Sequence, residues 1–336
     1  MHRFPVSFSR NKATYILVFS VFCAVLGFVN NSAASTVTEF ILLGFPGCQE
    51  LQYFLFSLFF GIYIFTVVGN GTIVCAVRWN QRLHTPMYIL LGNFAFLEIW
   101  YITSTVPSML IHFLSETKTI SFVDCFLQLY FFTSLGTTEV YLLCIMAYDR
   151  YLAICRPLHY PTIMTQQLCS VLLSLCWVFG FLSYSVSTVQ LSQLPFCGPN
   201  TIDHFVCDMD PLMALSCVPA PVTEIVLYVL SSLIIVLTLL YILGSYTLLL
   251  ITVFKVPSAA GRQKAFSTCG SHLTVVCFFF GALLATYVSP TADNPAESQK
   301  IITLFYSVVT PFLNPLIYSL RNKEMKAALK KVLKIE

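Results

Sequence analysis

The chain has 336 residues, of which 57% are hydrophobic and only 10% are charged. Soluble domains carry about one quarter charged residues, so this composition excludes an ordinary soluble protein and predicts a polytopic membrane protein. The net charge of +3 leaves no exposed basic face for nucleic acid. The GxxxxGK[ST], HExxH and GxSxG motifs of nucleotide-binding proteins and hydrolases do not occur in the sequence.

The first segment places Arg3, Arg10 and Lys12 before an apolar run at 13–29. A run this short after basic residues is typical of a signal peptide, and Ser32-Ala33-Ala34 supplies a cleavage site. An uncleaved extra helix is the alternative. We interpret 1–29 as a candidate signal peptide or N-terminal extension and 30–51 as an extracellular segment. Asn30 begins a glycosylation acceptor pattern, which cleavage beyond it would remove.

Seven long apolar segments follow, each long enough to cross a bilayer. They cover residues 52–77, 86–112, 123–153, 167–191, 222–254, 265–289 and 300–320. We therefore expect an all-α membrane protein with a seven-transmembrane helix bundle at 52–320. The tail, 321–336, places Met325, Leu329, Val332 and Leu333 on one face of a helix and lysines on the other. This pattern predicts a short amphipathic helix that lies on membrane lipid. A solvated basic tail is the alternative.

Charge distribution sets the expected orientation. Of the 18 Lys and Arg residues, thirteen lie in the tail, in the connectors after the first, third and fifth segments, and at the adjoining helix ends. Only Lys118 and Lys300 lie on the opposite side, together with ten of the 15 acidic residues. The positive-inside rule therefore places the C terminus in the cytoplasm and the N-terminal segment outside a multi-pass plasma-membrane protein.

Glu98 in the second segment and Glu139 in the third are the only acids deep in the bundle. If the two carboxylates lie close together, they cannot both be ionised at low cost. Either a cation such as sodium binds between them, or each carboxyl stays neutral and hydrogen-bonded, and both interpretations remain open. Pro315 follows Asn314 in the last segment and frees a backbone carbonyl. With Asn314 satisfying the freed groups, this break predicts a hinge, and a static kink is the alternative.

Four cysteines lie where disulfides form: Cys125 at the outer end of the third segment, and Cys197, Cys207 and Cys217 in the long outer loop. Four cysteines allow three pairings, and we expect Cys125 to pair with one loop cysteine and the other two to pair with each other. A metal cluster that uses His204 is the second possibility, although no CxxC or HxxxH spacing supports it.

Five motifs occur in order between residues 36 and 334 and together resemble the odorant receptor family. Within it, the chain is similar to the tetrapod-type (class II) branch of rhodopsin-like, class A G-protein-coupled receptors. The motifs are Leu83-His84-Thr85-Pro86-Met87-Tyr88, Met146-Ala147-Tyr148-Asp149-Arg150-Tyr151, Ser245-Tyr246, Lys264-Ala265-Phe266-Ser267-Thr268-Cys269 and Pro311-Phe312-Leu313-Asn314-Pro315-Leu316-Ile317-Tyr318.

The resemblance implies a receptor, and not an enzyme, that binds a small volatile odorant and activates a stimulatory, olfactory-type G protein to raise cyclic AMP. It implies the disulfides Cys125–Cys207 and Cys197–Cys217. It also implies that Glu98 and Glu139 surround a sodium ion, and no other cofactor is implied. The implied activation switch comprises Asp149, Arg150, Tyr151, Tyr246, His272, Asn314, Pro315 and Tyr318. The implied odorant contacts are Phe132, Thr133, Gly136, Thr137, Leu230, Ser231, Ile234, Phe280, Leu283, Leu284, Tyr287 and Ser307.

None of these odorant positions carries an ionised side chain, so we expect a neutral, mostly apolar ligand rather than an amine. Ordinary helix packing is the alternative role for each position. The chain departs from the family by reading Phe279-Phe280-Gly281 where Phe-Tyr-Gly is common, and by its longer N terminus. A cation channel or transporter using Glu98 and Glu139 is the rival function, disfavoured by the lack of an inverted repeat. An intramembrane enzyme is a more distant alternative.

Overall fold

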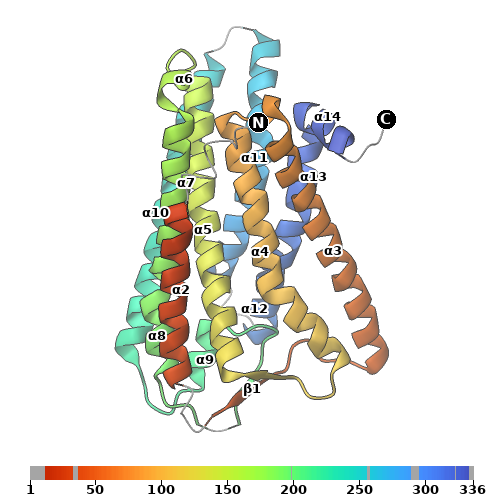
Figure 1. The fold of residues 1–336 in the computed structure, drawn as a ribbon, viewed down its shortest axis with the longest axis vertical. Coiled ribbons are helices and arrows are strands. Elements are labelled where there is room, and N and C mark those ends of the chain that lie inside the picture. Colours follow the sequence, from red (N-terminus) through yellow and green to blue (C-terminus); the bar gives the residue numbers. More distant parts are fainter. Residues whose placement is uncertain are drawn as a thin grey trace.

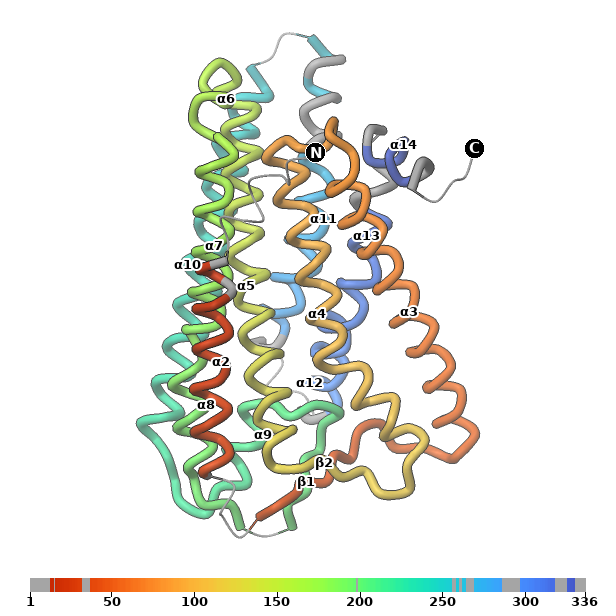
Figure 2. Tube along the Cα trace, in the orientation of Figure 1, coloured from red at the N-terminus to blue at the C-terminus, as the bar shows by residue number. Residues whose placement is uncertain are grey.

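The computed structural model describes residues 12–32, 37–197, 199–255, 258–288, 295–321 and 323–332. Long helices packed side by side form the body of the molecule (Figures 1 and 2). They are α3 (Gln49–Trp79), α4 (Pro86–Leu114), α5 (Phe122–Cys155), α7 (Gln166–Ser183) with α8 (Ser185–Ser192), α10 (Pro221–Phe254), α11 (Ala259–Val288), and α12 (Pro295–Leu304) with the π-helical turn Phe305–Val309 and α13 (Thr310–Arg321).

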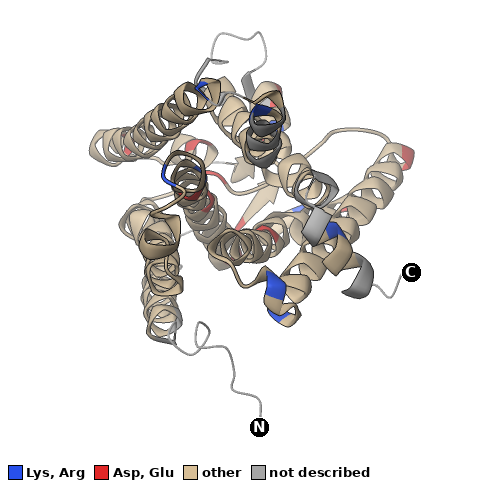
Figure 3. Cartoon of the chain, turned by 90° about the horizontal axis from the view of Figure 1, so that it is seen from above, with Lys and Arg blue, Asp and Glu red and all other residues tan. Residues whose placement is uncertain are grey.

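These elements confirm the expected all-α, seven-helix membrane bundle. Six of them contain a helix long and apolar enough to span a membrane within the described residues. The described apolar part of α11, Cys269–Ala285, is shorter than those six. Seen from one end, most of the ribbon carries no charge (Figure 3). Helix α5 lies at the centre of the bundle, where it contacts α4, α7 and α10.

The fourth segment is not one helix as predicted, because it is interrupted at Tyr184 between α7 and α8. The hydroxyls of Ser185 and Tyr130 both donate to the carbonyl of Phe181, at 2.6 and 3.1 Å. Side-chain donors of this kind compete with the backbone ladder and favour a break in a helix. A similar irregularity, the π-helical turn Phe305–Val309, interrupts the last segment.

A small sheet closes one end of the bundle and was not predicted. Strand β1 (Glu39–Leu42) pairs antiparallel with β2 (Thr119–Ser121) and parallel with β3 (Thr201–Ile202). Its fully buried Phe40 packs against the ring of Phe122 at 5.9 Å and the ring of Phe196 at 5.5 Å. The sheet therefore ties together three connectors that are distant in the sequence.

Short helices complete the chain: η1 (Gln81–Leu83), α6 (Tyr160–Ile163), α9 (Met209–Ala214) and α14 (Lys323–Val332). Helix α14 is the predicted tail helix, and it buries Met325 and Ala328 as it packs against α3 and α13. The N-terminal apolar run forms α2 (Lys12–Ser32), which lies beside α7 and α8 (Figures 1 and 2). Cleavage of this segment and glycosylation of Asn30, whose side chain is exposed, remain predictions.

Candidate functional site

A cavity of about 210 Å³ lies between α5, α10, α11 and the loop that contains α9. Its walls come from seven of the expected odorant positions: Phe132, Thr133, Gly136, Thr137, Ser231, Ile234 and Leu283. Twelve further residues complete the lining: Tyr101, Val140, Tyr184, Asp208, Met209, Asp210, Met213, Leu227, Tyr228, Ile235, Phe279 and Tyr306. Helix α5 contributes one continuous face of this lining, from Phe132 to Val140.

The other expected odorant positions do not line this cavity. Leu284 is 41% exposed, because it lies about 100° around the helix from Leu283. Phe280 is buried beside the cavity-lining Phe279, and Leu230 is half-buried on α10. Ser307 is buried and donates its hydroxyl to the carbonyl of Thr303 at 2.6 Å. The side chain of Tyr287 lies outside the described residues.

Stacked rings make up one wall of the cavity. The ring of Phe132 stacks on that of Tyr101 at 5.4 Å and on that of Tyr306 at 5.9 Å. This stack joins α4, α5 and the π-helical turn, so part of the wall is fixed by packing between helices. Two of the cavity residues that the sequence analysis missed, Leu227 and Phe279, could have been found from the helical period, because they lie four residues before Ser231 and Leu283. Tyr306 could not, because nothing in its apolar run indicates π-helical geometry.

Polar groups in the cavity are mainly hydrogen-bond acceptors. The hydroxyls of Thr133 and Thr137 donate to carbonyls of their own helix, at 2.8 Å each, which leaves their oxygens to accept. The hydroxyls of Tyr184 and Ser231 lie 2.8 Å apart and hydrogen-bond each other. A bound molecule therefore meets oxygen acceptors along α5 and a hydroxyl pair between the fourth and fifth segments.

Two carboxylates, at positions outside the expected odorant contacts, also line the cavity. Asp208 accepts from the backbone N–H of Met209 at 2.8 Å, and Asp210 accepts from the hydroxyl of Tyr228 at 3.2 Å. Desolvation raises the pKa of Asp208, and desolvation followed by the charge of Asp208 raises the pKa of Asp210. No local pattern predicts this placement, because it depends on how the long loop folds.

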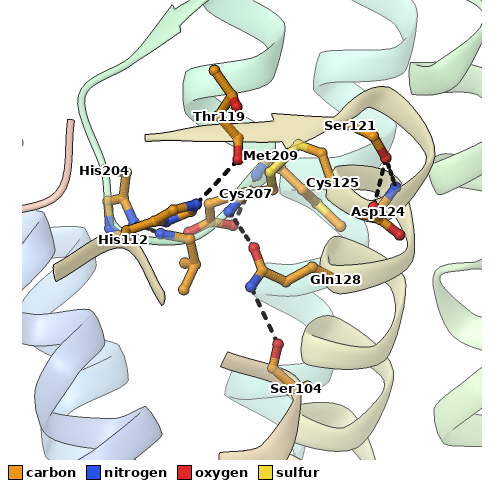
Figure 4. Close-up of a disulfide and its surroundings, with 12 residues drawn as sticks. Ser104, His112, Thr119, Ser121, Asp124, Cys125, Gln128, His204, Cys207 and Met209 are labelled. Atoms are coloured by element: carbon orange, nitrogen blue, oxygen red, sulfur yellow. Dashed lines mark hydrogen bonds between the residues drawn. A yellow bond between two sulfur atoms is a disulfide. The ribbon is translucent and has the colours of Figure 1, made fainter. Parts of the chain in front are cut away.

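Two disulfides hold that loop over the bundle. Cys125 at the start of α5 is joined to Cys207, with 5.5 Å between their Cα atoms, and Cys197 is joined to Cys217. These are the pairs that the family resemblance implies. Figure 4 shows that the backbone N–H of Cys207 also donates to Gln128, at 3.0 Å, and that Gln128 donates to the carbonyl of Ser104 at 3.2 Å. The loop is therefore anchored to both α5 and α4.

The metal-cluster interpretation of the loop cysteines is wrong, because all four of them are consumed by disulfides. Nδ1 of the buried His204 accepts from the N–H of Val206 at 3.2 Å. Across the described ranges, no group of three or more His, Cys, Asp or Glu residues is arranged to hold a metal.

Below the cavity, Glu98 and Glu139 are fully buried. The side-chain amide of Asn314 donates to one oxygen of Glu98. The other oxygen of Glu98, both oxygens of Glu139 and the amide oxygen of Asn314 have no hydrogen-bond partner among the described residues. Unsatisfied buried oxygens are costly, and hard cations prefer oxygen ligands, so this donor set fits a sodium ion.

The backbone carbonyl that Pro315 leaves without its helical hydrogen bond is satisfied by Asn70, and not by Asn314 as expected. Proline removes the hydrogen bond to the carbonyl four residues earlier, which is that of Pro311. The amide of Asn70 donates to this carbonyl at 3.4 Å, whereas the amide of Asn314 is engaged by Glu98. A neighbouring helix therefore satisfies the break.

At the opposite end of the bundle, Asp149 and Arg150 form a buried ion pair. The hydroxyl of Tyr160, in α6, donates to Asp149 at 2.7 Å. Desolvation raises the pKa of Tyr160, and the charge of Asp149 raises it further. Tyr151 is half-buried against the main core.

His272 connects three helices near this ion pair. Its Nε2 lies 3.1 Å from the carbonyl of Leu143, which can only accept, so Nε2 carries the proton. Nδ1 therefore accepts from the hydroxyl of Tyr246 at 2.6 Å. Helices α5, α10 and α11 are joined by these two bonds. Tyr318 lies in α13, and its side chain is outside the described residues.

Comparison with known proteins identifies close relatives. A family described as olfactory receptors matches residues 59–335. Olfactory receptor 11H4 of Homo sapiens is 65% identical over 305 residues, which covers 91% of this chain and 94% of the relative. Olfactory receptor 11H6 of Homo sapiens is 64% identical and covers 94% and 96% of the two chains. Squid rhodopsin shares the fold, with a TM-score of 0.71, 16% identity and coverage of 86% and 82%.

Proposed function

We propose that this chain detects a small odorant in the cavity between α5, α10 and α11. The premise is that the chain belongs to the olfactory receptor family of G-protein-coupled receptors. It is accordingly a multi-pass membrane receptor and not an enzyme. Binding activates a stimulatory, olfactory-type G protein and raises cyclic AMP. The observation that carries the proposal is the cavity of about 210 Å³ beneath a loop held by a disulfide.

The cavity supports a ligand that is mostly apolar and carries one hydrogen-bond donor. Phe132, Ile234 and Phe279 offer apolar walls, and each 100 Å² of apolar ligand surface removed from water contributes about 2.5 kcal/mol. The acceptor oxygens of Thr133 and Thr137 favour an O–H or N–H group over a bare carbonyl. An alcohol therefore fits better than a ketone of the same carbon skeleton.

Transduction uses helices that carry residues at both ends of the bundle. Helix α5 holds cavity residues and the Asp149–Arg150 pair, α10 holds Ser231 and Tyr246, and α11 holds Leu283 and His272. A ligand shifts the receptor only if it binds the active arrangement more tightly. Separation of α5 from α11 at the inner end breaks the bond between His272 and the Leu143 carbonyl and releases Arg150 to engage the G protein.

Glu98, Glu139 and Asn314 would hold a sodium ion in the centre of the bundle, where it supplies the positive charge that the buried carboxylates lack. The orientation that this proposal adopts has the C-terminal helix α14 in the cytoplasm and the sheet formed by β1, β2 and β3 outside the plasma membrane. Membership of a receptor family disfavours the rival channel or transporter.

A cyclic AMP reporter screen of the full chain against a broad odorant panel tests the proposal. A Cβ added at Gly136 would meet the hydroxyl of Tyr101 at 3.4 Å, an ordinary contact, whereas one at Gly244 would meet nothing within 4 Å. Gly136→Val should therefore fill the cavity and weaken every agonist, while the control Gly244→Val should respond like the parent. Full potency of Gly136→Val at equal surface level would contradict the proposal.

A further inference from the structure

We propose that α2 remains in the mature receptor as an eighth membrane helix docked on the fourth segment, with Lys12 at the cytoplasmic side and Ser32 outside. Helix α2 has 21 residues and carries no charge after Lys12. At 1.5 Å per residue the helix extends about 31 Å, and its apolar run at 13–29 lies at the lower limit for crossing the roughly 30 Å hydrocarbon core of a bilayer. Removal as a signal peptide is the alternative that this proposal displaces.

One face of α2 is packed into the bundle. Val25 and Val29 are 3% and 0% exposed and belong to the main hydrophobic core. The ring of Phe22 lies 5.2 Å from that of Phe131 on α5, and Phe131 lies next to the cavity residue Phe132. Helix α2 also contacts α7 and α8, on either side of the break at Tyr184. It thus packs against both the interrupted fourth segment and α5.

The opposite face of α2 is apolar and exposed in the described part of the chain. Ile16 and Phe19 are 65 and 63% exposed. A helix that is apolar all round is stable only inside a protein or a membrane, so this face fits lipid chains. The hydroxyl of Ser20 is satisfied by the carbonyl of Ile16 at 2.8 Å, as a hydroxyl facing lipid must be.

The direction of α2 follows from the strand after it. Residues 33–38 connect α2 to β1, which pairs with the first outer loop and the long outer loop. The C-terminal end of α2 therefore lies at the outer end of the bundle, and its N-terminal end points toward the cytoplasm. Arg3, Arg10 and Lys12 then join the other basic residues on the inner side, in agreement with the positive-inside rule.

Retention and direction are tested together on the full chain carrying a C-terminal tag. The intact mass of receptor purified from the cell surface should include α2. A membrane-impermeant maleimide on intact cells should label Cys48, which is exposed after β1, but not a cysteine introduced by Lys12→Cys until the cells are permeabilised. A mass that begins after residue 29, or labelling of Lys12→Cys on intact cells, would overturn the proposal.

Docking is tested by cross-linking Phe22→Cys to Phe131→Cys, in a chain with a protease site inserted within residues 33–36. After proteolysis, α2 should stay attached to the receptor under non-reducing conditions and be released on reduction. The matched control is Phe131→Cys alone, because the native Cys23 is exposed and lies one position further around α2. Equal attachment in the control, or no attachment in the double variant, would contradict docking on this face.

Discussion

Gly180 on α7 lies tightly against α5, and replacing it with alanine tests this packing. A Cβ at this position would lie 1.9 Å from Oγ1 of Thr138, 3.0 Å from its Cβ and 3.1 Å from the backbone oxygen of Ser134. Rotation of Thr138 relieves only the first clash and gives up its hydrogen bond to the Ser134 carbonyl, at 2.8 Å. The backbones of α5 and α7 must therefore separate.

The expected magnitude follows from two opposing effects. Alanine in place of glycine in a helix interior stabilises by about 1 kcal/mol, whereas overpacking a close contact costs about 1–3 kcal/mol. The severity of the Gly180 contact favours the upper end, so we expect a net loss of about 2 kcal/mol. Gly244 on α10 has open space around its Cβ, and Gly244→Ala should gain about 1 kcal/mol.

The assay is thermal unfolding of detergent-purified receptor, followed by size-exclusion chromatography, with the surface level in cells as a second readout. The two alanine variants should move the melting temperature in opposite directions, with Gly180→Ala lower than the parent and Gly244→Ala higher. A Gly180→Ala receptor as stable as Gly244→Ala would refute the close approach of α5 and α7.

Three further predictions concern single side chains. Arg150→Ala should abolish the cyclic AMP response at equal surface level, because the buried ion pair is the proposed switch; a normal response would exclude that role. Tyr246→Phe removes the hydroxyl that donates to His272 at 2.6 Å, and a lost buried hydrogen bond costs about 1–3 kcal/mol; basal signalling should change measurably, and an unchanged basal level would exclude a role in the switch. Burial, followed by the charge of Lys300, lowers the pKa of His204 to about 4 from the ordinary 6.5. Between these two pH values the unfolded state binds a proton that the folded state does not, so the free energy of unfolding decreases as the pH is lowered. The receptor should lose about 2 kcal/mol between pH 7.4 and pH 5, and His204→Asn should lose less; equal pH dependence would contradict the assignment.

The bundle was predictable because each membrane helix is a long uncharged run. The third segment, expected at 123–153, is α5 at Phe122–Cys155. Irregular features were not predictable from such runs. The break at Tyr184 depends on hydroxyls from two helices that meet at the Phe181 carbonyl, and strands of two to four residues carry too little pattern to be recognised.

For the site, the family resemblance identified residues on the cavity faces of α5 and α10 but not the loop that closes them. Asp208 and Asp210 reach the cavity because the neighbouring Cys207 is tied to α5. Likewise, the carbonyl freed by Pro315 finds its donor in Asn70, on a helix more than two hundred residues earlier in the chain. Contacts of this range are properties of the folded bundle and leave no local signal in the sequence.

A cryo-EM structure of the receptor with the first activating odorant from the screen would show whether an odorant binds in the cavity between α5, α10 and α11. Ligand density should be bounded by Phe132, Ile234 and Phe279, with the polar group of the ligand toward Thr133 and Thr137. Density at another site, with this cavity filled by side chains, would contradict this proposal.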